Sequence, residues 1–410
     1  MDFKQMDDFK TFTDILSRCY PMMEVRTAED KKEMTEHRKR MESYDMVSHN
    51  AVYEEDQMVG GYIAYAFPMN VYDQTLPSVG VGTLAVDLPY KKRGIAKDMI
   101  IHAIGKARGE GFPLMQLYPF RPDFYRKMGF GFGPQLNVFR VSPGQVPYFN
   151  EADAVIPLNE NHLEDIKRCY HDWAEDHHGA CDKQEYEFRH IAAEHTHTVG
   201  CRINGQLKGY LVYEMKQDSS FKHDLKIIDW FSNSNEAFQS LLTFLHQQKD
   251  QVSNIIFPTF DDDFAFMFHD PRHASKQLIH RIYHGTHERG TGLMYRIVNV
   301  PLFMMYIADH SFGQQTVAIN FKVTDSLLNE ESAHSIQFQN GKPQMSDEHL
   351  GHGISLSIDI ADLSSLLMGC IPLQKLLDYN KADADGNHDE IAKAIELFGR
   401  PTKPVSWTFF

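Results

Sequence analysis

The feature that most constrains the fold is an order of helices and strands that occurs twice along the chain. In each copy, two helices precede a hairpin, an apolar strand and a further helix. The first copy comprises residues 9–19, 31–41, 46–67, 79–86 and 93–108. The second comprises residues 162–175, 182–194, 197–215, 225–231 and 236–248. This repetition predicts two consecutive domains with one mixed α/β fold.

The remaining sequence predicts a third domain and the limits of all three. Pro143 and Pro147 mark a break after the first copy, and Asn204-Gly205 predicts a type I′ turn in the second hairpin. The third part opens with the strand MYRIVNV and has alternating strands, two short helices and a polar loop at 381–389. The predicted domains are residues 1–148, 149–295 and 296–410.

Composition narrows the class of protein. The chain has 410 residues, of which 42% are hydrophobic, and no stretch of about 18 apolar residues that would span a bilayer. Its net charge of −15 argues against nucleic acid and anionic membranes as partners and favours a cationic small molecule. Its five cysteines are scattered singly, and no secretory leader is evident, so we expect a cytoplasmic protein with free thiols.

The stretch that carries chemistry is VGVGTLAVDLPYKKRGIAKDMI, in which a basic turn leads from a strand into a helix. Backbone N–H groups at a helix start converge on one point, and the helix dipole adds positive charge there, so such a start binds phosphate. Small residues let a pyrophosphate approach the backbone, and basic residues add charge. The alternative is an ordinary helix start with surface lysines. The turn comprises Lys91, Lys92, Arg93, Gly94, Ile95 and Ala96.

With the later segment DFYRKMGFG, this turn resembles the GNAT acetyltransferases, whose pyrophosphate loop reads R/Q-x-x-G-x-G/A. Lys91 stands where that family has arginine or glutamine, whereas Gly94 and Ala96 match. Two such halves, the join GLMYRIVNV, a sterol-carrier-like third domain and an aromatic C-terminus are similar to the enhanced intracellular survival family of N-acetyltransferases. The resemblance covers the whole chain. It implies acetyl-CoA as cosubstrate, no metal, and a homo-hexamer.

The resemblance also implies the catalytic residues. The family's general acid matches Tyr125, and its terminal carboxylate matches that of Phe410, which would orient the amine and pass its proton to water. The strand Leu84-Ala85-Val86 would offer the Val86 amide to the thioester oxygen. Simple alternatives are a packed aromatic residue at 125 and a plain buried strand. A flexible tail is disfavoured because the end of the chain, WTFF, is too aromatic to leave in water.

The resemblance also implies candidates for the acceptor site, because Tyr20 and Glu24 match a region where members of that family line the substrate pocket. An exposed loop charge is the simpler interpretation of Glu24. The expected activity is therefore transfer of an acetyl group to a primary amine of an aminoglycoside, a polyamine or a lysine-like acceptor. The alternative is a non-catalytic module that senses acyl-CoA or binds lipid. The second half reads SNSNEAF after its strand, without a basic glycine-rich turn, so we expect it to be a degenerate domain that does not bind coenzyme A.

Two further patterns fail as motifs. Gly80-x-Gly82-x-x-Ala85 resembles a dinucleotide fingerprint, but its glycines lie at a strand and do not open a helix. The segment 383–387 resembles a calcium loop. However, its sixth position is His388, where glycine is required, and its twelfth is Ala394, where glutamate is required.

Overall fold

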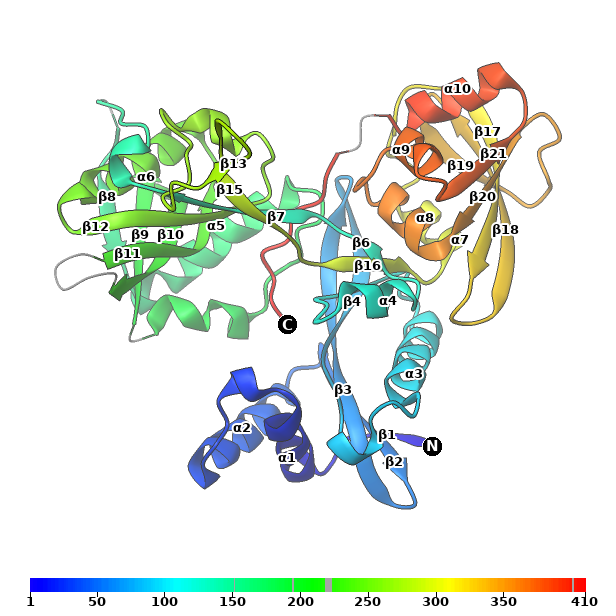
Figure 1. The fold of residues 1–410 in the computed structure, drawn as a ribbon, viewed down its shortest axis with the longest axis horizontal. Coiled ribbons are helices and arrows are strands. Elements are labelled where there is room, and N and C mark those ends of the chain that lie inside the picture. Colours follow the sequence, from blue (N-terminus) through cyan, green and yellow to red (C-terminus); the bar gives the residue numbers. More distant parts are fainter. Residues whose placement is uncertain (151, 194, 218–222, 400–401) are drawn as a thin grey trace. The chain divides into compact units, whose positions relative to one another are not determined.

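The computed structural model describes residues 1–150, 152–193, 195–217, 223–399 and 402–410 (Figure 1). It comprises two compact units. Unit 1 contains residues 1–133, 293–404 and Phe410, and unit 2 contains residues 134–292 and 405–409. Among the described residues, none of the helices combines the length and the apolar character needed to cross a bilayer.

Unit 1 contains a seven-stranded sheet in the order β1-β2-β3-β4-β5-β16-β6. In Figure 1, two helices lie to one side of β3 and a third lies to the other side. The strands are β1 (Asp2–Gln5), β2 (Val47–Glu54), β3 (Gln57–Val71), β4 (Gln74–Val86), β5 (Leu114–Leu117), β6 (Gly131–Phe132) and β16 (Met294–Ile297). The helices are α1 (Phe9–Cys19), α2 (Ala28–Met41), α3 (Ile95–Gly109) and the short α4 (Pro122–Arg126).

The first two helices follow directly from their sequences. Helix α1 has the predicted limits, because the Asp8 side chain caps its first turn and its apolar face, with Phe12 and Ile15, is fully buried. Helix α2 starts three residues earlier than predicted, at a capping box formed by Thr27 and Asp30.

Strands β3 and β4 are both longer than predicted, and they form a hairpin that was not predicted. The two strands run on to a tight turn at Tyr72 and Asp73, whose φ angles are 56° and 62°. Pro68 and Pro77 lie opposite each other within the extension. Proline has no backbone N–H to donate, so pairing the two prolines with each other places both missing donors at one position of the ladder.

Strands β4 and β5 separate part of the way along the sheet. They pair in parallel only at Ser78, Val79 and Gly80. On its other edge, β4 carries a bulge against β3, where Thr83 has a φ of 51° and the register shifts. The end of β4 beyond Gly80 therefore turns away from β5 and leaves one edge open.

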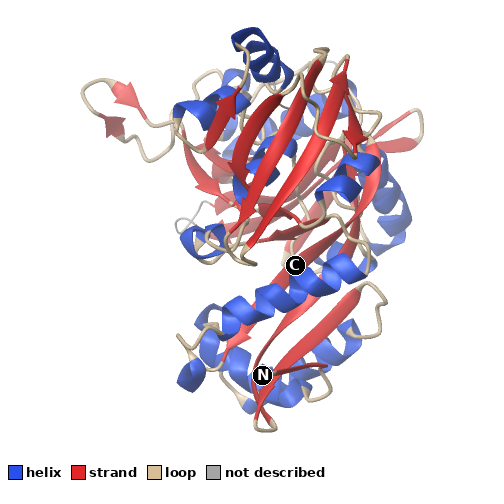
Figure 2. Ribbon diagram, turned by 90° about the vertical axis from the view of Figure 1, so that its right-hand side faces the viewer, coloured by secondary structure: helices blue, strands red, loops and turns tan. Residues whose placement is uncertain are grey.

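The rest of unit 1 is a second sheet, in the order β19-β18-β17-β20-β21, with helices on one face. Figures 1 and 2 show its strands on one side and its helices on the other. The strands are β17 (Val317–Asp325), β18 (Glu330–Gln339), β19 (Lys342–Ser346), β20 (Ile354–Asp359) and β21 (Ala382–Asp385). The helices are α7 (Val300–Tyr306), α8 (Ile360–Leu367), α9 (Leu373–Asp378) and α10 (His388–Leu397).

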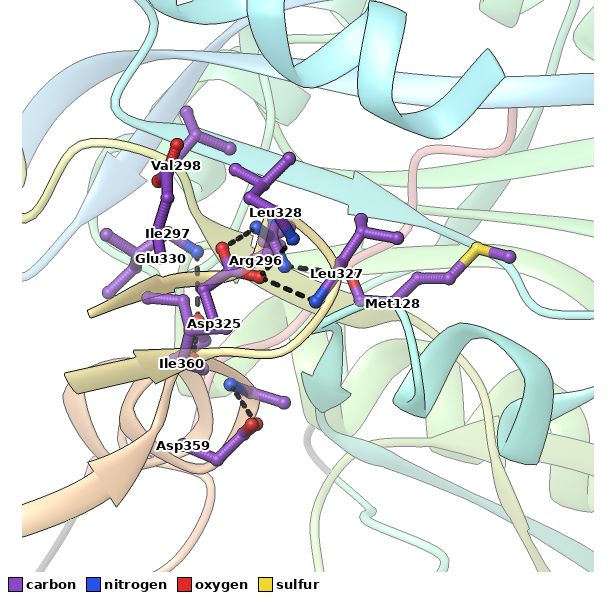
Figure 3. A network of polar contacts seen from close by, with 12 residues as sticks. Met128, Arg296, Ile297, Val298, Asp325, Leu327, Leu328, Glu330, Asp359 and Ile360 are labelled. Carbon is purple, nitrogen blue, oxygen red and sulfur yellow. Dashed lines mark hydrogen bonds and ion pairs between the residues drawn. The ribbon is translucent and has the colours of Figure 1, made fainter. Parts of the chain in front are cut away.

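Strand β16 differs from the prediction in its partners. Its pattern predicted a strand that opens the third domain, but it pairs with β5 and β6 in the first sheet. Its Arg296 is fully buried and bonds to the Met128 carbonyl and to the Asp325 carboxylate of β17 (Figure 3). A strand pattern reveals which residues are extended but not which distant edge they join.

We expect Arg296→Ala to lower the free energy of unfolding by about 3–5 kcal/mol, because the Asp325 carboxylate would stay buried without its partner. Urea denaturation measures the change. The control is Arg93→Ala, which breaks a half-exposed pair with Glu54 and should cost about 1 kcal/mol or less. Equal losses in both variants would contradict the role assigned to Arg296.

Unit 2 contains a seven-stranded sheet in the order β15-β7-β12-β11-β10-β9-β8. Its strands are β7 (Gln135–Val141), β8 (Val155–Leu158), β9 (Thr196–Ile203), β10 (Gln206–Gln217), β11 (His223–Ser232), β12 (Val252–Thr259) and β15 (His287–Thr291), with a separate hairpin of β13 (Leu278–Ile279) and β14 (Tyr283–His284). Helices α5 (Leu163–Glu175) and α6 (Asn235–Gln247) complete it. The predicted Asn204-Gly205 turn is confirmed, with φ angles of 51° and 82°.

Two elements of unit 2 depart from expectation. Strand β7 was counted in the first domain but pairs with β12 and β15. The predicted helix 182–194 is a 3₁₀ segment over Glu185–Ala192 instead, and residue 194 lies outside the described residues. Lys183 precedes that segment, and its ammonium lies in the interior 2.6 Å from the Asp229 carboxylate.

Candidate functional site

The start of α3 provides backbone donors without a competing cap. Gly94 occupies the N-cap position with a φ of 86°, which glycine tolerates, and no side chain accepts from the first turn. A Cβ atom at Gly94 would meet no other atom within 4 Å, so the backbone is approachable from outside. Helix α3 has 15 residues, long enough for its dipole to favour an anion at this end.

The open edge of β4 faces the last residue of α1 and the residue that follows it. The Tyr20 hydroxyl donates to the Leu84 carbonyl at 2.6 Å, and the Cys19 thiol donates to the Val86 carbonyl at 3.1 Å. Burial raises the pKa of the Cys19 thiol, which therefore stays neutral as a donor. These bonds show that alternate residues of this strand direct their polar groups away from β3.

A cavity of about 500 Å³ joins the strand edge to the helix start. Most of the residues predicted to bind the cofactor line it, together with Tyr20 from the predicted acceptor site. The lining residues are Cys19, Tyr20, Pro21, Met22, Leu84, Ala85, Val86, Tyr90, Lys91, Lys92, Gly94, Ile95, Ala96, Lys97, Phe120, Arg121 and Phe124. Such a volume suits an extended small molecule.

Among the residues predicted to bind the cofactor or the acceptor, two lie elsewhere. The Arg93 guanidinium forms two hydrogen bonds to the Glu54 carboxylate, at 2.7 and 2.9 Å, and lies over the Tyr90 ring. The Glu24 side chain is 78% exposed, lies 3.6 Å from Arg26, and is absent from the cavity wall. The structure therefore does not bring these two side chains to the cavity.

Tyr125 lies behind the cavity wall. It is 4% exposed, and its ring packs edge-on against Phe120 at 5.7 Å and Phe124 at 5.2 Å, both of which line the cavity. Burial raises the pKa of the Tyr125 phenol well above its usual value, and Tyr20 adds to the shift. Burial likewise raises the pKa of Tyr20, to about 12. Both phenols are therefore protonated, and each can donate a proton but cannot accept one.

The chain terminus lies on strand β4, over two glycines. The Phe410 ring would lie 2.6 Å from a Cβ atom at Gly80, and the Phe410 carboxyl carbon 2.9 Å from one at Gly82. The Phe410 ring also contacts Tyr65 and Tyr118, with centroids 5.7 and 5.4 Å away. The two glycines therefore provide the space that the last residue occupies.

Several residues of this site were not predicted. The aromatic wall at Phe120 and Phe124 was missed, although its signal is the run YPFRPDFY that follows β5. The glycines beneath Phe410 were predicted at the start of a strand, but they lie within β4, which begins at Gln74. Nothing near these glycines in the sequence indicates what packs against them, because their partner, Phe410, lies more than 300 positions away.

The corresponding helix start in unit 2 is closed. Helix α6 follows β11, as α3 follows β4, but Ser234 caps it and accepts a hydrogen bond from the Ala237 amide. At the start of α6 the Ser234 oxygen therefore engages one backbone amide. The start of α3 has no such side-chain acceptor, because its N-cap residue is Gly94. Within the described ranges, no three histidine, cysteine or acidic side chains gather as they would around a metal ion.

Comparison with protein families matches each part of the chain. Residues 4–133 and residues 168–297 each match an acetyltransferase (GNAT) domain, and residues 306–407 match a sterol carrier protein domain. The predicted order of domains is thereby confirmed. No curated protein matches the chain in sequence.

Solved structures share the fold over the full length. A GCN5-related N-acetyltransferase from Anabaena variabilis is 18% identical, with a TM-score of 0.79 and complete coverage of both chains. A probable N-acyltransferase from Enterococcus faecalis is 17% identical, with a TM-score of 0.78, and covers 100% of this chain and 99% of its own. Eis1 from Mycobacterium abscessus is 18% identical, with a TM-score of 0.77 and complete coverage of both chains. The chain therefore belongs to the GNAT acetyltransferases, with two such domains in tandem followed by a sterol carrier protein domain.

Proposed function

We propose that unit 1 transfers the acetyl group of acetyl-CoA directly to a primary amine of a small cationic acceptor. The observation that carries this proposal is the cavity that joins the uncapped start of α3 to the open edge of β4. One surface suits the pyrophosphate of an acyl-CoA, the other suits its thioester, and both border one space.

The start of α3 suits the pyrophosphate. The amides of Ile95 and Ala96 lie in its first turn, and Lys91 and Lys92 add positive charge on the cavity wall. The open space beside Gly94 allows an anion to approach the backbone closely. The same turn with a larger residue at 94 would be strained, since its φ is 86°.

The edge of β4 suits the thioester. The Val86 carbonyl accepts from Cys19 on the edge that faces away from β3, and the N–H of a strand residue points to the same edge as its carbonyl. The Val86 amide would therefore stabilise negative charge on the thioester oxygen as the amine attacks.

The proposed reaction needs no covalent enzyme intermediate. The neutral amine nitrogen bonds to the thioester carbon, the carbon–sulfur bond breaks, and the Tyr125 phenol gives its proton to the departing thiolate. The Phe410 carboxylate stabilises the positive charge on the amine, whose proton passes to water. That carboxylate is too weak a base to remove the proton efficiently alone.

The acceptor is proposed to be an aminoglycoside, a polyamine or a lysine-like amine. A chain with a net charge of −15 attracts such cations, and Tyr20 on the cavity wall would contact the bound amine. Glu24 stays a candidate only if the loop that holds it changes conformation on binding, because its carboxylate is exposed.

The test is release of free thiol from acetyl-CoA in the presence of a panel of amines, with mass spectrometry of each product. We expect at least one polyamine or aminoglycoside to gain an acetyl group. Absence of product with every amine, together with a lipid that co-purifies with the protein, would instead support the non-catalytic module.

We further propose that the protein is cytoplasmic and forms a hexamer, and that unit 2 does not bind coenzyme A. The Ser234 cap at the start of α6 supports the last point. Light scattering of the purified chain measures the assembly, and a mass of one or two chains would contradict the hexamer.

A further inference from the structure

Unit 2 has a cleft built like the one that opens beside β4. Strands β11 and β12 pair in parallel only up to Lys226 and Ile256 and then separate. The register of β10 and β11 shifts at Ile228, as the register of β3 and β4 shifts at Thr83. The architecture of an acyl-CoA cleft is therefore retained, although the helix start beside it is capped.

The cleft is partly filled by the chain's own C-terminal segment. Val405 donates its backbone N–H to the His178 carbonyl at 2.8 Å. Trp407 is 6% exposed, and its ring packs edge-on against Phe231 of β11 and Phe260 beyond β12. An acyl-CoA cannot occupy the volume that Trp407 fills.

A cavity of about 180 Å³ remains beside this segment. Its wall contains all three tryptophans of the chain, Trp173, Trp230 and Trp407. The other lining residues are His177, Phe231, Ser232, Phe238, Thr259, Phe260, Asp261 and Val405. So many aromatic rings around a small space form a cage of the type that holds organic cations.

Charge around the cage favours a cation. Asp261 is the one carboxylate on its wall, and no lysine or arginine lines it among the residues that the structure describes. The aromatic cluster already accommodates one ammonium, because Lys183 lies 5.0 Å from the centroid of the Phe231 ring. The charge of Lys183 is balanced by Asp229, so it adds little repulsion.

We propose that this cage binds a small quaternary or alkylated ammonium compound. The rings supply cation–π attraction, which is strongest for tryptophan, and the Asp261 carboxylate supplies a countercharge. The site lies wholly in unit 2 and is separate from the proposed acetyl transfer. Its ligand would bind whether or not unit 1 has activity.

Intrinsic tryptophan fluorescence of the full chain tests the proposal, because every tryptophan lines the cage. Choline is the probe, and 3,3-dimethylbutan-1-ol is its neutral counterpart of the same shape. We expect a saturable change in emission with choline and a much weaker one with the alcohol, at matched ionic strength. No change with choline, or equal responses to both compounds, would overturn the proposal.

Variants locate the site. Asp261→Asn should weaken choline binding about threefold to fivefold, as expected for loss of one exposed countercharge, and leave the response to the alcohol unchanged. Asp263→Asn is the matched control, since its side chain is exposed and does not line the cage, and should bind choline as the parent does. Equal effects of the two changes would contradict the assignment.

The aromatic wall is tested with Trp230, which is only half-buried. Trp230→Leu should weaken choline binding about tenfold, and Trp230→Phe should recover part of the affinity, because phenylalanine is a weaker cation–π partner. Circular dichroism of both variants checks folding, and isothermal titration replaces fluorescence for them. Unchanged affinity in a folded Trp230→Leu variant would exclude the cage.

Discussion

Appending a few residues after Phe410 should lower kcat by about two orders of magnitude, as expected when a charged group that assists proton transfer is removed. The extension converts the terminal carboxylate to an amide, and the new residues would have to pass through the space above Gly82. The carboxyl carbon already lies 2.9 Å from a Cβ position there. Affinity for acetyl-CoA, measured by isothermal titration, should stay the same because the α3 start is untouched.

The control for this extension is the same short peptide added before Met1, whose side chain is half-exposed. A second variant separates loss of charge from loss of space. Gly82→Ala keeps the carboxylate but places a Cβ against it, so it should displace the terminus and also reduce kcat. Full turnover in both the C-terminal extension and Gly82→Ala would contradict any role for the terminus.

The sequence predicted the local parts of the site well, because their causes are local. A glycine before a helix and basic neighbours predicted the open start of α3, and Ser234 before α6 has the complementary signature of a closed one. Capping is decided within three or four residues, so it is visible in the sequence. The strand at Leu84–Val86 was predicted from its apolar pattern in the same way.

The parts that sequence could not predict depend on distant partners. Strand β16 has the pattern of any buried strand, and its place beside β5 depends on residues 180 positions away. Arg93 lies in the predicted turn, yet Glu54 at the end of β2 holds its guanidinium. A side chain's direction is decided by such tertiary contacts, which spacing along the chain does not encode.

The same limit applies to Gly80 and Gly82. A glycine within a strand weakens it, so two in alternation suggest that something approaches the backbone closely. The sequence alone could not say whether that is a ligand, another strand or a terminus. Phe410 resolves this in unit 1, and its fit over the strand supports the proposed role of the terminal carboxylate.

Tyr125→Phe should reduce kcat by about 10²–10⁴-fold, which is the usual contribution of a general acid. The substituted ring keeps its packing against Phe120 and Phe124, so folding and acetyl-CoA affinity should be unchanged. Because burial raises the pKa of Tyr125, its phenol keeps its proton throughout the neutral and mildly alkaline range. Ionisation of Tyr125 should therefore produce no fall in kcat of the parent up to about pH 10.

Two further tyrosines make the assignment specific. Tyr53→Phe removes a surface hydroxyl that lies 3.4 Å from Asp7, outside the cavity, and should leave kcat unchanged. Tyr20→Phe removes a phenol that lines the cavity and already donates to the Leu84 carbonyl, so it should raise KM for the amine more than it lowers kcat. If Tyr20→Phe abolished turnover while Tyr125→Phe retained it, the proton donor would be Tyr20, because both phenols are protonated and only one can lie against the departing sulfur.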